Sequence, residues 1–68
     1  MEIKYLVFTD SYLLSVFYTD ANCWQYSLVF KDNSFYCPHE LFYSSNAAYL
    51  EAREAARNVM ALKKMYEN

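Results

Sequence analysis

Residues 44–68 read SSNAAYLEAREAARNVMALKKMYEN, and this stretch predicts one long amphipathic α-helix. Apolar and mostly small side chains recur at intervals of three and four residues, as on the buried face of a helix. This face comprises Ala48, Tyr49, Ala52, Ala55, Ala56, Val59 and Leu62, with Lys63 and Tyr66 in the same rows. About 21 residues at ~1.5 Å per residue span roughly 30 Å, which is enough to cross a small sheet.

Both ends of this helix carry suitable residues. Ser44 or Ser45 can accept a hydrogen bond from a free amide of the first turn. Glu54 and Arg57 are three residues apart, so they can pair on the solvent side. The positive charges of Lys63 and Lys64 suit the C-terminal end of the helix dipole. The alanines add helix propensity and allow the helix backbone to lie close to its neighbour.

The preceding residues predict an antiparallel β-meander. Residues 3–9, 12–19 and 24–31 are rich in β-branched and aromatic side chains and are separated by turns of Asp, Asn and Ser. Residues 35–43 predict a further edge strand, in one piece or two, because Pro38 cannot donate to a ladder. The fold class is therefore α+β, with three to four strands and the helix packed on one face.

Loop lengths predict the register of the hairpins. A two-residue loop at positions 10–11 places Tyr5 opposite Val16, Val7 opposite Leu14, and Phe8 opposite Leu13. A hairpin centred on Asn33 places Cys37 opposite Val29, about 20 Å from Cys23 at ~3.3 Å per residue. A disulfide needs Cα atoms within about 7 Å, so both cysteines are expected to be reduced thiols.

Both sides of the first predicted hairpin are apolar. One side carries Ile3, Tyr5, Val7, Leu14, Val16 and Tyr18; the other carries Leu6, Phe8, Leu13 and Phe17. The alternating strand at 24–31 predicts that Trp24, Tyr26, Leu28 and Phe30 lie under Ala52, Ala56 and Val59 of the helix. One helix covers one face, so an apolar patch is left for a second copy, as a homodimer, or for another protein. Alternatively, a strongly curled meander wraps the helix and hides more of both sides.

Composition narrows the functional classes. The 68 residues form a single domain (1–68) with 56% hydrophobic residues, including eight tyrosines, and no run long enough to cross a membrane. Glycine is absent, which excludes glycine-rich phosphate loops and dinucleotide fingerprints. A net charge of −2 disfavours a nucleic-acid surface. The N-terminus has no signal-peptide pattern, so a cytoplasmic location is expected.

No cluster in the sequence predicts catalysis. Cys37 and His39 stand close together but lack a third orienting group, and a zinc site would need Cys23 and Glu40 to converge with them. Asp10, Asp20 and Asp32 each head a turn, which explains them without a metal. We therefore expect no enzyme activity, no metal and no cofactor.

The sequence thus predicts a small non-catalytic protein-binding module. In size and composition it resembles small phage-encoded antagonists of host complexes, such as anti-CRISPR proteins, which implies inhibition by surface occlusion. The predicted interaction surface comprises Tyr5, Leu6, Phe8, Leu13, Phe17, Tyr18, Tyr36 and Tyr43.

The alternative is a small nucleic-acid-binding domain that uses exposed tyrosines and basic helix residues. Its predicted contacts are Arg53, Arg57, Lys63 and Lys64. The order of three strands and a helix also resembles plant-type and integrase-type DNA-binding domains. Those domains carry arginines on the sheet, whereas the predicted strands here contain only Lys4 and Lys31 as basic residues, so DNA binding is not carried over.

Overall fold

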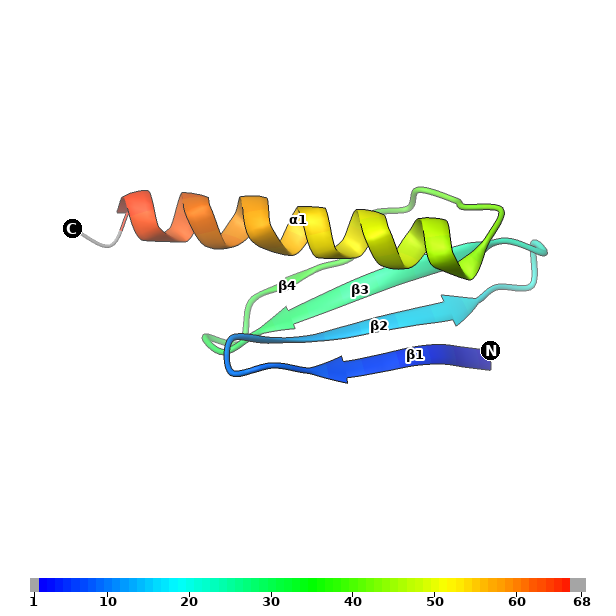
Figure 1. The fold of residues 1–68 in the computed structure, drawn as a ribbon, viewed down its shortest axis with the longest axis horizontal. Helices are drawn as coiled ribbons and strands as arrows, with labels where there is room; N and C mark the ends of the chain where they lie inside the picture. Colours follow the sequence, from blue (N-terminus) through cyan, green and yellow to red (C-terminus); the bar gives the residue numbers. More distant parts are fainter. Residues whose placement is uncertain (1, 67–68) are drawn as a thin grey trace.

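The computed structural model describes residues 2–66 and has an α+β fold in which one helix lies across a four-stranded antiparallel sheet (Figure 1). The strands follow chain order, β1-β2-β3-β4, so the predicted meander is confirmed. The elements are β1 (Glu2–Phe8), β2 (Tyr12–Tyr18), β3 (Trp24–Phe30), β4 (Phe35–Tyr36) and α1 (Ser45–Tyr66). The part of the helix prediction that covers residues 67 and 68 lies outside the described residues.

The turns work without glycine because asparagine takes the left-handed positions. Asn22, between β2 and β3, has φ 61°, and Asn33, between β3 and β4, has φ 70°. Asparagine tolerates this region better than most residues. In the second of these turns Asp32 Oδ1 accepts hydrogen bonds from the Ser34 amide (3.0 Å) and the Ser34 hydroxyl (2.6 Å). The prediction that Asp, Asn and Ser build the turns is confirmed.

The β1–β2 register is as predicted over most of its length and wrong at one end. Tyr5 pairs with Val16, Val7 with Leu14, and Phe8 with Leu13. Between Ile3 and Tyr5, β1 has a bulge in which Lys4 has no partner on β2. The pairing shifts by one residue there, so Ile3 pairs with Phe17. Ile3 therefore lies on the side of Leu6 and Phe8, and the sequence-based assignment of Ile3 to the Tyr5 side is wrong.

The β3–β4 register also differs from the prediction. Phe35 pairs with Val29 and Tyr36 with Leu28, so the hairpin centres on Asp32, and the placement of Cys37 opposite Val29 is wrong. The three-residue loop is residues 31–33, one position earlier than a centre on Asn33 requires. Asn33 takes the left-handed position at the end of the loop (φ 70°), and its amide donates to the Phe30 carbonyl (3.0 Å).

Pairing resumes beyond Pro38 at a single bridge between Trp24 and Phe42. The edge strand is therefore in two pieces, one of the two forms that the sequence left open. Cys23 is buried and Cys37 is exposed, and both are free thiols as predicted.

The core lies between the alanines of the helix and the large side chains of β2 and β3. Ala48, Ala52 and Ala56 are at most 1% exposed. They pack against Leu14, Val16, Tyr26, Leu28 and Phe30, with Trp24 and Val59 at the margin, which confirms the predicted contact. Burial, with a smaller contribution from Tyr36, raises the pKa of Tyr26 to about 12. Ser44 caps the helix by accepting a hydrogen bond from the Ala47 amide (3.0 Å).

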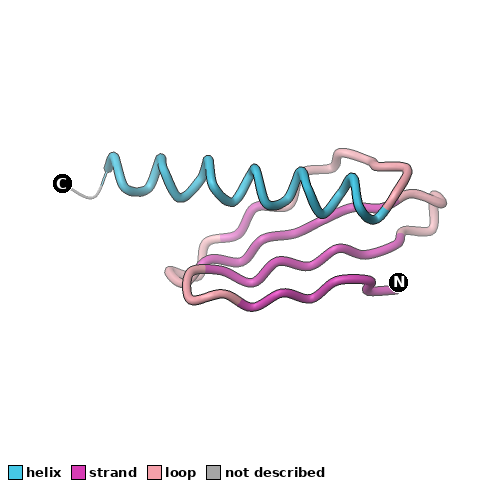
Figure 2. The backbone as a smooth tube through the Cα atoms, viewed as in Figure 1, coloured by secondary structure: helices cyan, strands magenta, loops and turns pink. Residues whose placement is uncertain are grey.

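The helix is longer than the sheet it covers. Its 22 residues span about 33 Å at ~1.5 Å each, whereas a seven-residue strand spans about 23 Å. The C-terminal turns of α1 therefore project past the ends of the strands (Figures 1 and 2). In the part of the chain that the structure describes, no helix has the length and hydropathy needed to cross a membrane.

The close helix–sheet contact predicts that Ala52→Leu is destabilising. Ala52 is 0% exposed, so three extra carbons have no space, and we expect a loss of about 1–3 kcal/mol in the free energy of unfolding. Ala47→Leu, at an exposed position of the same helix, is the matched control and should change stability little. Urea unfolding followed by circular dichroism measures both, and equal stabilities for the two variants would contradict the packing described.

Candidate functional site

The face of the sheet turned away from the helix is apolar and uncovered, and we call it the outer face. It carries Ile3, Leu6, Phe8, Leu13, Phe17, Val29 and Phe35. Phe8 and Phe35 are 74% and 77% exposed, and Val29 is 42% exposed. The predicted apolar patch therefore exists, and the sheet does not wrap the helix to hide it (Figure 1).

One row of the outer face crosses the whole sheet. Phe8 pairs with Leu13, Leu13 with Val29, and Val29 with Phe35. Directly paired residues point to the same side, so this row is a continuous apolar strip with one residue from each strand. The next row is more polar. It consists of Leu6 on β1, Ser15 on β2 and Ser27 on β3, and the hydroxyls of the two serines hydrogen-bond to each other (2.6 Å).

The outer face is also uncharged at its paired positions. In the described ladders, the remaining outward residues are the two serines and Gln25. Lys4 stands at the bulge, and Glu2 pairs with Tyr18 on the helix side. Burial of the paired positions therefore removes no ionised group from water. Charged residues lie at the rim: Lys4 at the bulge, and Asp10 and Lys31 in a hollow that they share with Phe8, Leu13 and Val29.

The structure divides the predicted interaction surface between two sides of the sheet. Leu6, Phe8, Leu13 and Phe17 lie on the outer face. Tyr5 and Tyr18 lie on the helix side, where their rings are 5.0 Å from those of Tyr49 and Trp24, respectively. Tyr36 is on the same side at the β4 edge (42% exposed), and Tyr43 is 94% exposed just before the helix.

Val29, Phe35 and Ile3 also belong to the outer face but were not among the predicted residues. Val29 could have been predicted from the alternation of β3, because it lies on the face opposite to Trp24. Phe35 lies on the Val29 side in both the predicted and the observed register, but only the observed register places it directly opposite Val29. Ile3 needed the bulge at Lys4.

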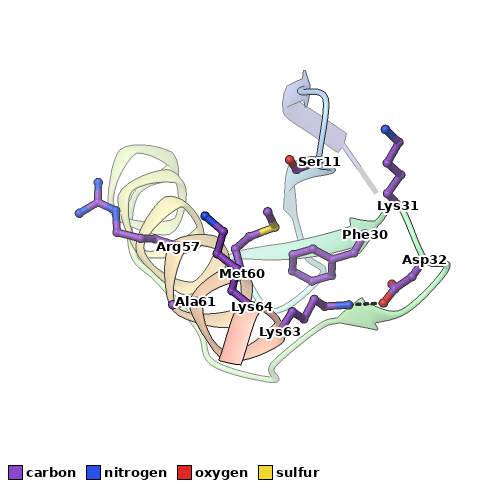
Figure 3. Close-up of a pocket in the computed structure, with 9 residues that line it drawn as sticks. All are labelled: Ser11, Phe30, Lys31, Asp32, Arg57, Met60, Ala61, Lys63 and Lys64. Atoms are coloured by element: carbon purple, nitrogen blue, oxygen red, sulfur yellow. Dashed lines mark hydrogen bonds and ion pairs between the residues drawn. The ribbon is translucent and has the colours of Figure 1, made fainter. Parts of the chain in front are cut away.

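A second feature is a basic groove beside the projecting part of the helix (Figure 3). It has a volume of about 500 Å³ and lies between α1 and the turns that follow β1 and β3. Its lining comprises Ser11, Phe30, Lys31, Asp32, Arg57, Met60, Ala61, Lys63 and Lys64. We call this set the basic groove.

The basic groove contains three of the four predicted nucleic-acid contacts and one residue that the sequence did not associate with them. Arg57, Lys63 and Lys64 join Lys31 from the end of β3. Arg53 stands apart, with its guanidinium carbon 5.7 Å from the centre of the Tyr49 ring.

Lys63 fixes the helix to the β3–β4 turn. Its Nζ lies 2.5 Å from Asp32 Oδ2 and 2.6 Å from the Ser34 hydroxyl, and 4.8 Å from the centre of the Phe30 ring. The hydrogen bond from Lys63, supported by those from Ser34, holds the pKa of Asp32 well below its usual range. In Figure 3 the Lys63 side chain runs along Phe30 to reach Asp32.

The candidate metal ligands are not brought together within the described residues. Within residues 2–66, no three His, Cys, Asp or Glu side chains come close enough together to hold a metal ion. His39 and Cys37 are both exposed in the segment after β4.

Comparison with protein-family models, curated proteins and solved structures finds no match to this chain. The outer face and the basic groove are the two surface features that bear on its function.

The Asp32–Lys63 pair predicts a specific pH dependence. Because the pKa of Asp32 is lowered by folding, its contribution to stability is complete above the ordinary aspartate value of about 3.9 and is lost as pH falls below it. We expect Asp32→Asn to be less stable than wild type at pH 7 and to lose less stability between pH 5 and pH 2. Thermal unfolding across this range measures the effect. Asp20→Asn, at the opposite end of the sheet, should keep the wild-type slope, and an unchanged slope in Asp32→Asn would contradict the assignment.

Proposed function

We propose that this protein is a non-catalytic protein-binding module and that the outer face is its binding surface. The observation that carries the proposal is the apolar row Phe8, Leu13, Val29 and Phe35, which spans all four strands on the side without a helix. In two-layer domains the free face of an antiparallel sheet is normally polar. A contiguous exposed apolar patch usually marks a surface that another molecule covers.

The occupant that best fits this surface is a second copy of the chain. In a two-fold symmetric dimer the same patch of each protomer meets its copy. A patch with a net charge would therefore be repelled by the identical charge on the other protomer. The paired positions of the outer face carry no charge, and this obstacle is absent. Two such sheets can pack about 10 Å apart with their side chains interdigitated.

The outer face is small for such a contact. Three strands of seven residues cover about 14 by 23 Å, and the two-residue β4 adds a short strip at one edge. This flat area is less than half of the roughly 800 Å² per partner of a standard stable interface, and the protruding Phe8 and Phe35 add to it.

The alternative occupant is a foreign protein. In that case the module acts as the surface-occluding antagonist of a host complex that the sequence predicts, and its outer face is free until the partner arrives. The two occupants differ in one measurable property: a dimer buries the outer face against itself, whereas an antagonist that uses this face is a monomer on its own.

The homodimer predicts a mass that depends on the outer face. Light scattering from micromolar to hundreds of micromolar should give twice the chain mass of 8.1 kDa for the wild type. The double variant Phe8→Ser/Phe35→Ser should weaken dimerisation by at least about tenfold, because buried aromatic anchors contribute a large part of binding energy at interfaces.

Tyr43→Ser is the matched control, since Tyr43 is 94% exposed but lies off the outer face. This variant should dimerise like the wild type. A wild type that stays monomeric throughout would reject the second copy as occupant and favour the foreign partner. A dimer that survives the double variant would show that its interface lies elsewhere.

A further inference from the structure

We propose that the basic groove binds a small phosphate monoester that carries an apolar group. This inference rests on a set of residues that is different from the outer face, although Lys31 also lines a hollow with Phe8, Leu13 and Val29. It follows from the distribution of charge, from the positions of the four cations and from the apolar surface between them.

The charge of the chain is strongly segregated. Among residues 2–66, four of the six Lys and Arg residues and one of the seven acidic residues line the basic groove, so this lining carries a formal charge of 4 − 1 = +3. The other described residues carry 2 − 6 = −4. A positive groove on an acidic protein attracts a multiply charged anion to one place.

Lys63 is tied to the β3–β4 turn, whereas Lys31, Lys64 and Arg57 extend from the edges of the groove in different directions (Figure 3). Lys63 is already paired with Asp32, which neutralises the one carboxylate that the described residues contribute to the lining. Between residues 2 and 66, Lys31 and Lys64 make no ion pair. Arg57 contacts Glu54 at 3.7 Å, but both side chains are more than half exposed, and such a pair contributes little.

The groove also offers apolar contact. Met60 and Ala61 on the helix and Phe30 on β3 lie between the cations (Figure 3). Phe30 is only 5% exposed, so a ligand would touch mainly Met60 and Ala61. Ser11 adds a hydroxyl at the wall formed by the β1–β2 turn. The volume of about 500 Å³ lies within the range of roughly 300–1,000 Å³ that is typical of small-molecule sites.

A small ligand fits these observations better than a nucleic-acid strand. The cations surround a single groove, and Arg53, which would extend the track, is placed over Tyr49. A strand longer than the groove would pass over the acidic remainder of the chain. A phosphate monoester places about two negative charges at one point, which matches the positive groove.

The test is an NMR titration of the full chain labelled with ¹⁵N. Phenyl phosphate should shift the amide signals of residues around the groove, such as Ser11, Lys31 and Lys64. It should bind at least about tenfold more tightly than benzyl alcohol, which lacks the charge, since hydrogen bonds to charged groups are stronger than hydrogen bonds between neutral groups. It should also bind more tightly than inorganic phosphate, which lacks the ring. Adenosine monophosphate and phosphotyrosine carry the same phosphate monoester on a nucleoside and on an amino acid, respectively. Saturable binding of either ligand in the groove supports the proposal, and the tighter of the two indicates which kind of ligand the groove prefers.

The double variant Lys31→Gln/Lys64→Gln should lose at least about tenfold in affinity while keeping a dispersed spectrum. Lys4→Gln/Arg53→Gln also removes two positive charges but none from the groove lining, so it is the charge-matched control that should bind like the wild type. Absence of shifts at 10 mM phenyl phosphate, or equal affinity for phenyl phosphate and inorganic phosphate, would overturn the proposal. So would unchanged binding by the double lysine variant. Much tighter binding of a ten-nucleotide oligothymidine, with a steep loss in added salt, would replace the small ligand with a nucleic acid.

Discussion

The contact between three alanines of α1 and the sheet determines the architecture. Ala48, Ala52 and Ala56 are almost completely inaccessible, so the helix backbone lies close to β2 and β3. The large core side chains therefore come mainly from the sheet, which supplies Leu14, Leu28 and its aromatic neighbours. A single helix held this closely covers only the face it touches. The other face of the same strands remains in solvent, although it is also apolar.

The difference in length between helix and strands produces the second feature. Because α1 continues past the sheet, its last turns have no strand beneath them, and the basic groove forms in the angle between these turns and the hairpin loops (Figure 1). Lys63 spans this angle to reach Asp32. The pair ties the projecting helix to the β3–β4 turn, and it leaves Lys31 and Lys64 as the cations of the groove without an ion pair among the described residues.

Local patterns in the sequence predicted the core well, because the period of 3.6 in the helix and the period of two in β3 each identify a buried face. They also predicted most of the first hairpin, whose two-residue loop fixes the register. They failed where one residue changes the pairing without a distinctive signal. One such residue is Lys4, an extra residue in an otherwise regular strand, and the other is Asn33, which ends the three-residue loop instead of standing at its centre. The complete apolar row was missed because Phe35 depends on that loop.

The basic groove could not be predicted, because Lys31 and Arg57 are far apart in sequence and meet only through the tertiary packing. The outer face and the basic groove place the exposed apolar surface and most of the positive charge on different parts of the molecule. The outer face is apolar and uncharged at its paired positions. Burial of these positions therefore does not carry the cost of removing ions from water. The cations are concentrated beside the helix, where water remains in contact with them. Pairing of two sheets through their outer faces would leave both helices, and hence both basic grooves, accessible. A dimer and an anion-binding site are therefore compatible on a chain of this size, and each can be removed by substitutions that do not touch the other.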